Sequence, residues 1–122
     1  MDGVGEVRRL IRAAGFSWAG LQAAFRHEAS FRLEVAVTLL AVPLALWLGD
    51  DGLERGVLIG VWMLVIVIEL INSGIEAVVD RMGEERHPLA GRAKDMGSAA
   101  VLVAGVNAGV VWLLILFNYR TG

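Results

Sequence analysis

The sequence predicts an all-α membrane protein with three transmembrane helices and an N-terminal amphipathic surface helix. Hydrophobic residues make up 57% of the 122 residues, and the mean hydropathy is +0.63. A soluble domain of this length has too little interior to bury so much apolar surface. Three long apolar runs contain most of these hydrophobic residues, and each approaches the length that a bilayer-spanning helix needs. We therefore treat residues 1–122 as one membrane domain.

The composition also excludes several classes of protein. The net charge is −2 and the basic residues form no dense cluster, so nucleic acid is not an expected partner. The chain has no cysteine, which excludes disulfide frameworks, thiolate zinc sites and cysteine nucleophiles. The N-terminal segment lacks the continuous apolar stretch of a cleavable signal peptide.

Residues 5–27 have the pattern of an amphipathic helix. Leu10, Trp18 and Phe25 share a broad apolar stripe at helical spacing, while Arg8 and Arg12 fall outside it. Such a helix suits the interface between lipid and water. A helix packed on a soluble core would have the same pattern, but the segments that follow are membrane-spanning.

Three membrane spans are expected at residues 30–48, 53–79 and 96–117. Pro43 interrupts the hydrogen bonding of the first span, and an acidic turn at 49–52 follows it. Gly83, Pro88 and Gly91 predict a polar loop of about fifteen residues before the third span. The first half of the third span is rich in small residues, which let membrane helices approach closely.

The basic residues predict the orientation of the chain. Nine of the eleven Lys and Arg residues lie before residue 33 or between residues 81 and 94. Basic residues concentrate on the cytoplasmic side of membrane proteins. The N-terminus and the loop at 80–95 are therefore expected in the cytoplasm, and the C-terminus outside.

An acidic face on the second span is the strongest functional signal. At 100° per residue, Glu69, Glu76 and Asp80 fall within about 40° of one another, with Asn72 and Ser73 on either flank. Ionisable groups at membrane depth are costly, so this face must look into a protein interior or a water-filled site. The predicted orientation brings it close to the cytoplasmic surface.

The carboxylates of this face suit two roles. Glu69 is the deeper one, which makes it the candidate general base. Glu76 and Glu28 are expected at the same cytoplasmic level, and converging carboxylates suit a hard cation such as Mg²⁺. The alternative to a metal site is that these carboxylates form ion pairs with Arg32 or Arg81. The alternative to a base is that Glu69 is a buried, protonated glutamate with a structural role.

The segment at 91–95 is a candidate for binding phosphate. It precedes the predicted third span, where the start of a helix offers free N–H groups and a positive dipole end. Lys94, the single lysine of the chain, suits a phosphate, although a surface lysine that follows the charge bias is the alternative. The sequence has no Walker phosphate loop, kinase catalytic loop, HExxH motif or serine nucleophile elbow.

Two runs of sequence, ELINSGIEAVVDRMGEERHPLAGRAKDMGSAAVL and AAGFSWAGLQAAFRHEASFRLE, closely resemble the bacterial integral-membrane diacylglycerol kinases. The resemblance covers essentially the whole chain. It implies a homotrimeric enzyme of the bacterial inner membrane with active sites formed between subunits. It also implies transfer of the ATP γ-phosphate, with Mg²⁺, to the primary hydroxyl of diacylglycerol to give phosphatidic acid.

The resemblance assigns roles by matching position. Glu69 corresponds to the catalytic base with Asn72 in support, and Glu28 and Glu76 correspond to the metal-binding carboxylates. The positions that match nucleotide contacts are Arg9, Phe16, Glu28, Glu76, Glu85, Arg86, His87, Lys94 and Asp95. The positions that match lipid contacts are Arg9, Ala13, Ala14, Gly15, Phe16, Ser17, Trp18, Ser30, Phe31, Arg32, Leu33, Glu34, Trp47, Arg55, Glu69, Ser98 and Trp112.

Two positions depart from the family pattern, and two other functions stay open. Arg12 stands where relatives tend to have Lys, and Phe16 replaces the usual Tyr, which removes a hydroxyl from a nucleotide-contacting position. A related branch of the family phosphorylates undecaprenol. A non-catalytic membrane subunit, with Glu69 and Glu76 as a proton relay, is the alternative outside the kinases. Asp80 is expected to pair with Arg81 or a loop cation.

Overall fold

Helices make up nearly all of the described chain, because apolar segments in lipid must satisfy their backbone groups internally. The computed structural model describes residues 2–83 and 87–121, and this part of the chain contains four helices and no strand. The all-α prediction is therefore confirmed. The helices are α1 (Gly3–His27), α2 (Ala29–Leu48), α3 (Gly52–Arg81) and α4 (Pro88–Thr121).

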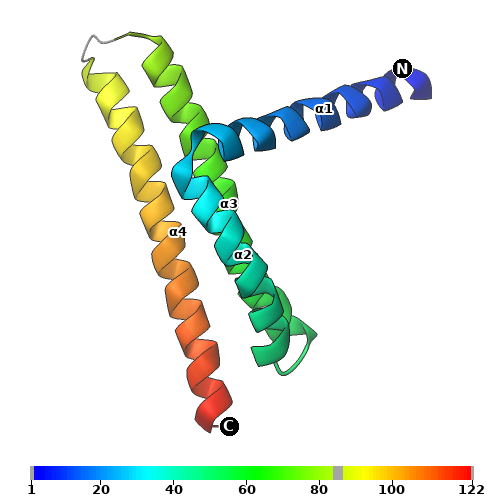
Figure 1. Cartoon of the computed structure of the whole chain (residues 1–122), viewed down its shortest axis with the longest axis vertical. Helices are drawn as coiled ribbons and strands as arrows, with labels where there is room; N and C mark the ends of the chain where they lie inside the picture. The colour runs from blue at the N-terminus through cyan, green and yellow to red at the C-terminus, as the bar shows by residue number, and fades with distance from the viewer. Residues whose placement is uncertain (1, 84–86, 122) are drawn as a thin grey trace.

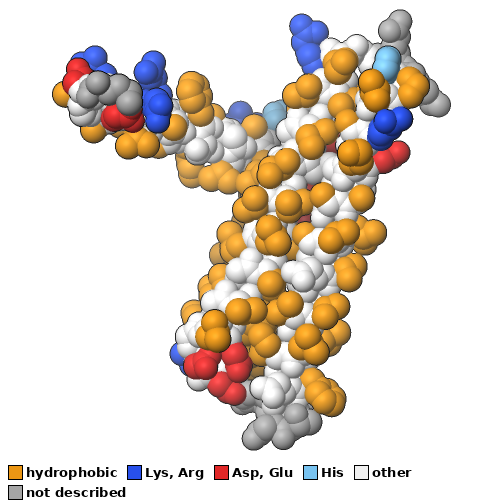
Figure 2. All heavy atoms as spheres, turned by 180° about the vertical axis from the view of Figure 1, so that it is seen from behind, with side chains coloured by type: hydrophobic (Ala, Val, Ile, Leu, Met, Phe, Trp, Pro, Cys, Tyr) orange, Lys and Arg blue, Asp and Glu red, His pale blue; other side chains and the backbone are white. Residues whose placement is uncertain are grey.

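The helices α2, α3 and α4 form an elongated bundle, and α1 projects from it at a large angle (Figure 1). Within the described residues, these three are the helices long and apolar enough to cross a membrane, with mean hydropathies of 1.8, 2.2 and 2.4. Figure 2 shows hydrophobic side chains over most of the visible face of the bundle, with charged groups gathered toward its ends. The prediction of three spans is confirmed.

Helix α1 packs on no core of its own. Ala24 is its buried residue, whereas large apolar side chains such as Leu10, Trp18 and Phe25 are exposed along its length. An isolated apolar stripe of this kind is stable where lipid covers it. The exposed stripe leaves these side chains for lipid or a neighbouring chain to cover, and the interfacial position of α1 stays a prediction.

The start of α4 differs from the prediction. The helix begins at Pro88, eight residues before the expected start at residue 96, so the predicted loop of about fifteen residues is wrong. Proline is favoured in the first turn of a helix because it needs no intrahelical N–H partner there. Gly91 is tolerated within the helix. Gly83, which follows the end of α3, has a φ of 102°, in the left-handed region that glycine adopts readily.

A single non-helical residue, Glu28, makes the elbow between α1 and α2. Its backbone is extended, with φ −116° and ψ 109°, and its N–H still donates to the Ala24 carbonyl of α1. Arg32 fastens the elbow, because its Nη1 donates to the carbonyl oxygens of Phe25 at 2.8 Å and Arg26 at 3.2 Å. These contacts fix the backbone of Glu28 at the elbow.

Helix α3 is the centre of the packing, since each cluster of buried apolar side chains contains a residue from it. The clusters are Ala24, Phe31 and Ile66; Ala45, Leu48 and Leu58; and Val65, Ala104 and Ala108. Two indoles add hydrogen bonds to this packing. Trp62 Nε1 donates to Thr38 Oγ1 of α2 at 2.7 Å, and Trp112 Nε1 of α4 donates to the Leu58 carbonyl at 3.1 Å.

The turn between α2 and α3 is closed by polar contacts. Asp51 caps α3 by accepting from the Glu54 N–H at 2.9 Å, and Arg55 Nε donates to the Gly49 carbonyl at 3.1 Å. A Cβ at Gly49 would lie 2.5 Å from Arg55 Cγ and 2.9 Å from the Arg55 backbone nitrogen. Only glycine fits at this position without moving the start of α3.

We expect Gly49→Ala to destabilise the fold by about 1–3 kcal/mol, because its methyl group would overlap a backbone atom. Gly52→Ala is the matched control in the same turn, since a Cβ there meets no atom within 4 Å. Thermal unfolding in detergent micelles measures both variants. Equal midpoints for the two would contradict this account of the turn.

Candidate active site

Glu69 is a buried carboxylate held by the neighbouring helix. It is 7% exposed, and Ser30 Oγ in the first turn of α2 donates to its Oε1 at 2.8 Å. The contact places Glu69 at the level of the elbow, so the end of α3 that carries Glu76 and Asp80 extends beyond the point where α1 leaves the bundle (Figure 1). A carboxylate with one oxygen held and little water around it is well placed to accept a proton.

A second carboxyl group shares this contact between α2 and α3. Glu34 lies one helical turn after Ser30, its Oε2 is buried without a hydrogen-bond partner, and it is close enough to Glu69 for the two groups to interact electrostatically. The acidic face predicted on α3 did not include Glu34, because it belongs to another helix. The family resemblance assigned it only to the lipid-contacting set.

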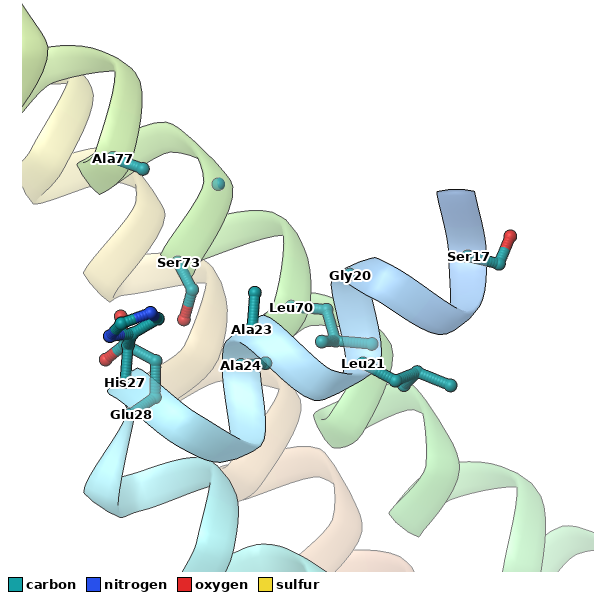
Figure 3. Close-up of a pocket in the computed structure, with 11 residues that line it drawn as sticks. Ser17, Gly20, Leu21, Ala23, Ala24, His27, Glu28, Leu70, Ser73 and Ala77 are labelled. Atoms are coloured by element: carbon teal, nitrogen blue, oxygen red, sulfur yellow. The ribbon is translucent and has the colours of Figure 1, made fainter. Parts of the chain in front are cut away.

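A pocket of about 670 Å³ lies between the C-terminal half of α1 and α3. His27, Glu28 and Ser73 supply polar groups at the end where α1 joins α2, while Leu21 and Leu70 belong to its apolar lining (Figure 3). The pocket therefore has an apolar part under α1 and a polar part at the elbow. That division suits a ligand with both a charged and an apolar portion.

Glu28 and Glu76 fit a magnesium ion by the chemistry of their donor atoms. Glu28 lines the pocket, and Glu76 is half-buried on α3 about one turn beyond Ser73. No cluster of three or more His, Asp or Glu side chains suited to a metal occurs in the described residues. Mg²⁺ is commonly bound through one or two carboxylates together with substrate phosphates, so two carboxylates match that mode of binding.

Lys94 and Asp80 form an ion pair between α4 and α3. Lys94 Nζ lies 3.1 Å from Asp80 Oδ1, and both side chains are partly exposed. Asp80, for which Arg81 or a loop cation was expected, thus has Lys94 as its partner. The pair lies beyond Glu69, at the end of the bundle that also carries the connection from α3 to α4.

The expectation that a helix starts directly after residues 91–95 and offers free N–H groups beside Lys94 is wrong, because these residues lie within α4. His87 caps the helix: its Nδ1 accepts from the Leu89 N–H at 3.1 Å, and its carbonyl accepts from the Gly91 N–H at 3.0 Å. Pro88 has no N–H to offer. Most donors of this helix start are therefore already used. Glu85 and Arg86 lie outside the described residues.

The remaining predicted contacts are spread over the molecule. Arg9 and Phe16 are exposed on the projecting helix α1, where Arg9 pairs with Glu6 at 3.5 Å. Arg55 lies fourteen residues before Glu69 on α3, which is about 21 Å at 1.5 Å per residue. The predicted contacts near that end of the bundle are Trp47, Arg55 and Trp112. One chain does not bring them together with Glu69.

Asn72, the predicted support of Glu69, lies on the side of α3 that meets α4, about 60° around the helix from Glu69. It is 9% exposed and lines a hollow between α3 and α4. Its Oδ1 is buried without a hydrogen-bond partner, and the described residues contain no hydrogen bond between Asn72 and Glu69. The two side chains therefore flank α3 on its α2 side and its α4 side. Sequence reasoning singled out Asn72 but not Gly97, the residue of α4 that it meets.

The chain matches known proteins over most of its length. A profile of the prokaryotic diacylglycerol kinase family matches residues 15–116. The diacylglycerol kinase of Escherichia coli strain K12 is 54% identical over 111 residues, which cover 91% of each chain. That of Pseudomonas aeruginosa is 47% identical over 112 residues (92% of this chain, 91% of the relative), and that of Haemophilus influenzae 45% over 108 (88% and 92%).

These matches agree with the geometry: three apolar helices, a base candidate at the elbow, and carboxylates and a lysine beyond it. The chain belongs to the prokaryotic diacylglycerol kinase family.

Proposed function

We propose that this protein is a membrane-embedded kinase that transfers the γ-phosphate of ATP to the primary hydroxyl of diacylglycerol, giving phosphatidic acid and ADP. The single observation that supports this best is the buried Glu69 carboxylate, held by Ser30 at the elbow from which the amphipathic helix α1 departs. A lipid hydroxyl near the membrane surface and a nucleotide from the water can meet at this level.

Each group has a distinct role in the proposed reaction. Glu69 accepts the proton of the lipid hydroxyl as the hydroxyl oxygen bonds to the γ-phosphorus, and the bond from that phosphorus to the β–γ bridging oxygen breaks. Glu28 and Glu76 would hold Mg²⁺, which when bound neutralises charge on the phosphates. Lys94 would pair with a phosphate oxygen. Phosphoryl transfer depends mainly on positioning and charge neutralisation, so few groups suffice.

We further propose that the protein works as a homotrimer in the bacterial inner membrane, with its N-terminus and the connection between α3 and α4 in the cytoplasm. Large apolar side chains cover α2, α3 and α4, and both lipid and neighbouring copies can bury them. The spread of the predicted contacts supports sites completed by a second copy. The distribution of basic residues supports the orientation.

The other candidate functions have less support. The relatives compared above are named diacylglycerol kinases, which does not favour undecaprenol as the main acceptor. A proton relay needs no lysine beside its carboxylates, whereas Lys94 lies at the same end of the bundle as Glu76.

We expect Glu69→Gln to lower kcat by about 10²–10⁴-fold, because the amide keeps the size of the side chain but cannot accept a proton. Phosphate transfer from labelled ATP to diacylglycerol and, separately, to undecaprenol in mixed micelles measures this. Glu54→Gln at the opposite end of α3 is the control and should retain activity. Full activity of Glu69→Gln would exclude Glu69 as the base, and transfer to undecaprenol alone would reassign the acceptor.

If Glu28 and Glu76 share a cation, their substitutions should not be additive. We expect Glu28→Gln and Glu76→Gln each to raise the Mg²⁺ concentration needed for half-maximal activity, and the double variant to add little to the larger single effect. Titration of the four proteins with Mg²⁺ at fixed ATP completes this double-mutant cycle. Effects that multiply in the double variant would show that the two carboxylates bind independently.

The pair between Lys94 and Asp80 predicts opposite effects on the affinity for ATP. Lys94→Gln should raise KM for ATP by about tenfold or more, because it removes a charge-assisted contact to phosphate. Asp80→Asn should lower it by about two- to threefold, since a surface ion pair contributes only about 0–1 kcal/mol and its carboxylate competes with the nucleotide. A higher KM in Asp80→Asn would indicate that Asp80 orients Lys94 instead.

A further inference from the structure

The side chain of Asn72 ends directly against Gly97 of α4. A Cβ added at Gly97 would collide with Asn72 Oδ1 and would lie 3.2 Å from its Cγ and 3.8 Å from its Cβ. These three atoms are the nearest to that position, and all belong to the side chain of Asn72. A larger residue at 97 therefore conflicts with the Asn72 amide and not with the backbone of α3.

The contact determines which way the amide faces. Asn72 Oδ1 is buried and accepts no conventional hydrogen bond, so its close neighbour is the Cα–H of Gly97. A Cα–H group is a weak hydrogen-bond donor, which matches a carbonyl oxygen. An amino group in the same place would direct N–H donors at a C–H group, with no acceptor for them. The oxygen therefore belongs on the side of α4.

The amino group of Asn72 then remains available. Among the described residues Nδ2 makes no hydrogen bond, and it is not among the buried polar atoms without a partner. An amide whose oxygen is sealed against a neighbouring helix can act only as a donor. Such a donor bonds most strongly to an anionic oxygen, as on a phosphoryl group or a carboxylate.

We propose that Gly97 is a positioning residue for the kinase reaction: by having no side chain, it lets Asn72 bury its carbonyl oxygen against α4 and present its N–H donors to an anionic oxygen at the reaction centre. This inference rests on the proposed function. It assigns Asn72 as a donor, so its side-chain oxygen is not a ligand of Mg²⁺.

The proposal predicts that Gly97→Ala folds but reacts slowly. The overlap involves the end of a flexible side chain, so the amide rotates and the helices keep their places. A displaced catalytic contact lowers kcat by about 10–100-fold, while KM for ATP and diacylglycerol stay within about twofold because ground-state binding is kept. Gly105→Ala on the same helix is the matched control, since a Cβ there meets no atom within 4 Å.

A double-mutant cycle separates positioning from packing. We expect Asn72→Ala to lower kcat about as much as Gly97→Ala does, and Gly97→Ala to cost nothing more in the Asn72→Ala background. The truncated side chain leaves room for the methyl group, so the double variant also folds if the single Gly97→Ala variant does not. The proposal would be overturned if the two substitutions lowered kcat multiplicatively in the double variant, or if Gly97→Ala kept full activity.

A second readout does not depend on activity. The chain has three asparagines, at positions 72, 107 and 118, so ¹⁵N labelling of asparagine gives few side-chain NH₂ signals. We expect Gly97→Ala to shift the Asn72 signals and to leave those of Asn107 unchanged, and unmoved Asn72 signals would contradict the contact. If the unaltered protein transfers phosphate to neither lipid, the proposed function fails. The shift of the Asn72 signals would still test whether Asn72 contacts Gly97.

Discussion

The hydrogen bond from Ser30 to Glu69 is the contact on which the rest of the arrangement depends. A carboxylate surrounded by apolar side chains needs a partner from within the protein, because lipid offers none. The partner is in the first turn of α2, so α2 must start at the depth of Glu69. Glu28 then has to turn the chain at the same level, and α1 leaves the bundle there. The Glu69 carboxylate and the point where α1 leaves the bundle thus lie at the same level along α3.

Helix α3 joins its two neighbours by different means. Toward α2, two hydrogen bonds about two turns apart accompany the apolar packing, with Ser30 bonded to Glu69 and Thr38 bonded to Trp62. Toward α4, the small residues Ala104 and Ala108 pack on Val65, and the Trp112 indole adds one hydrogen bond to the Leu58 carbonyl. Small residues allow the backbones to approach closely, whereas hydroxyl and indole groups fix their partners by direction. Each side of α3 therefore holds its functional side chain in a different way.

Sequence reasoning located the spans well and one helix start poorly. Hydropathy placed the ends of α2 and α3 within two residues, because lipid imposes one strong constraint on all such segments. It missed the start of α4 because Pro88 and Gly91 are common both in loops and near helix starts. Helical phase grouped Glu69 with Asn72, but a phase angle does not tell which neighbouring helix each side chain meets. The carboxyl of Glu34 and the bare backbone of Gly97 come from those neighbours, so no pattern within α3 could indicate them.

The positions of the predicted contacts support the proposal that several copies complete each site. Arg9 and Phe16 lie on the part of α1 that projects away from the bundle, and Phe16 is 76% exposed. Neither residue lines the pocket of its own chain, and Arg9 lies nineteen residues before Glu28, which is about 28 Å along α1. Because an interfacial helix lies in the membrane plane, its far end can instead reach the elbow of an adjacent copy at the same depth. The exposure of two positions that the family resemblance assigns to the nucleotide thus supports the proposal of a site shared between chains.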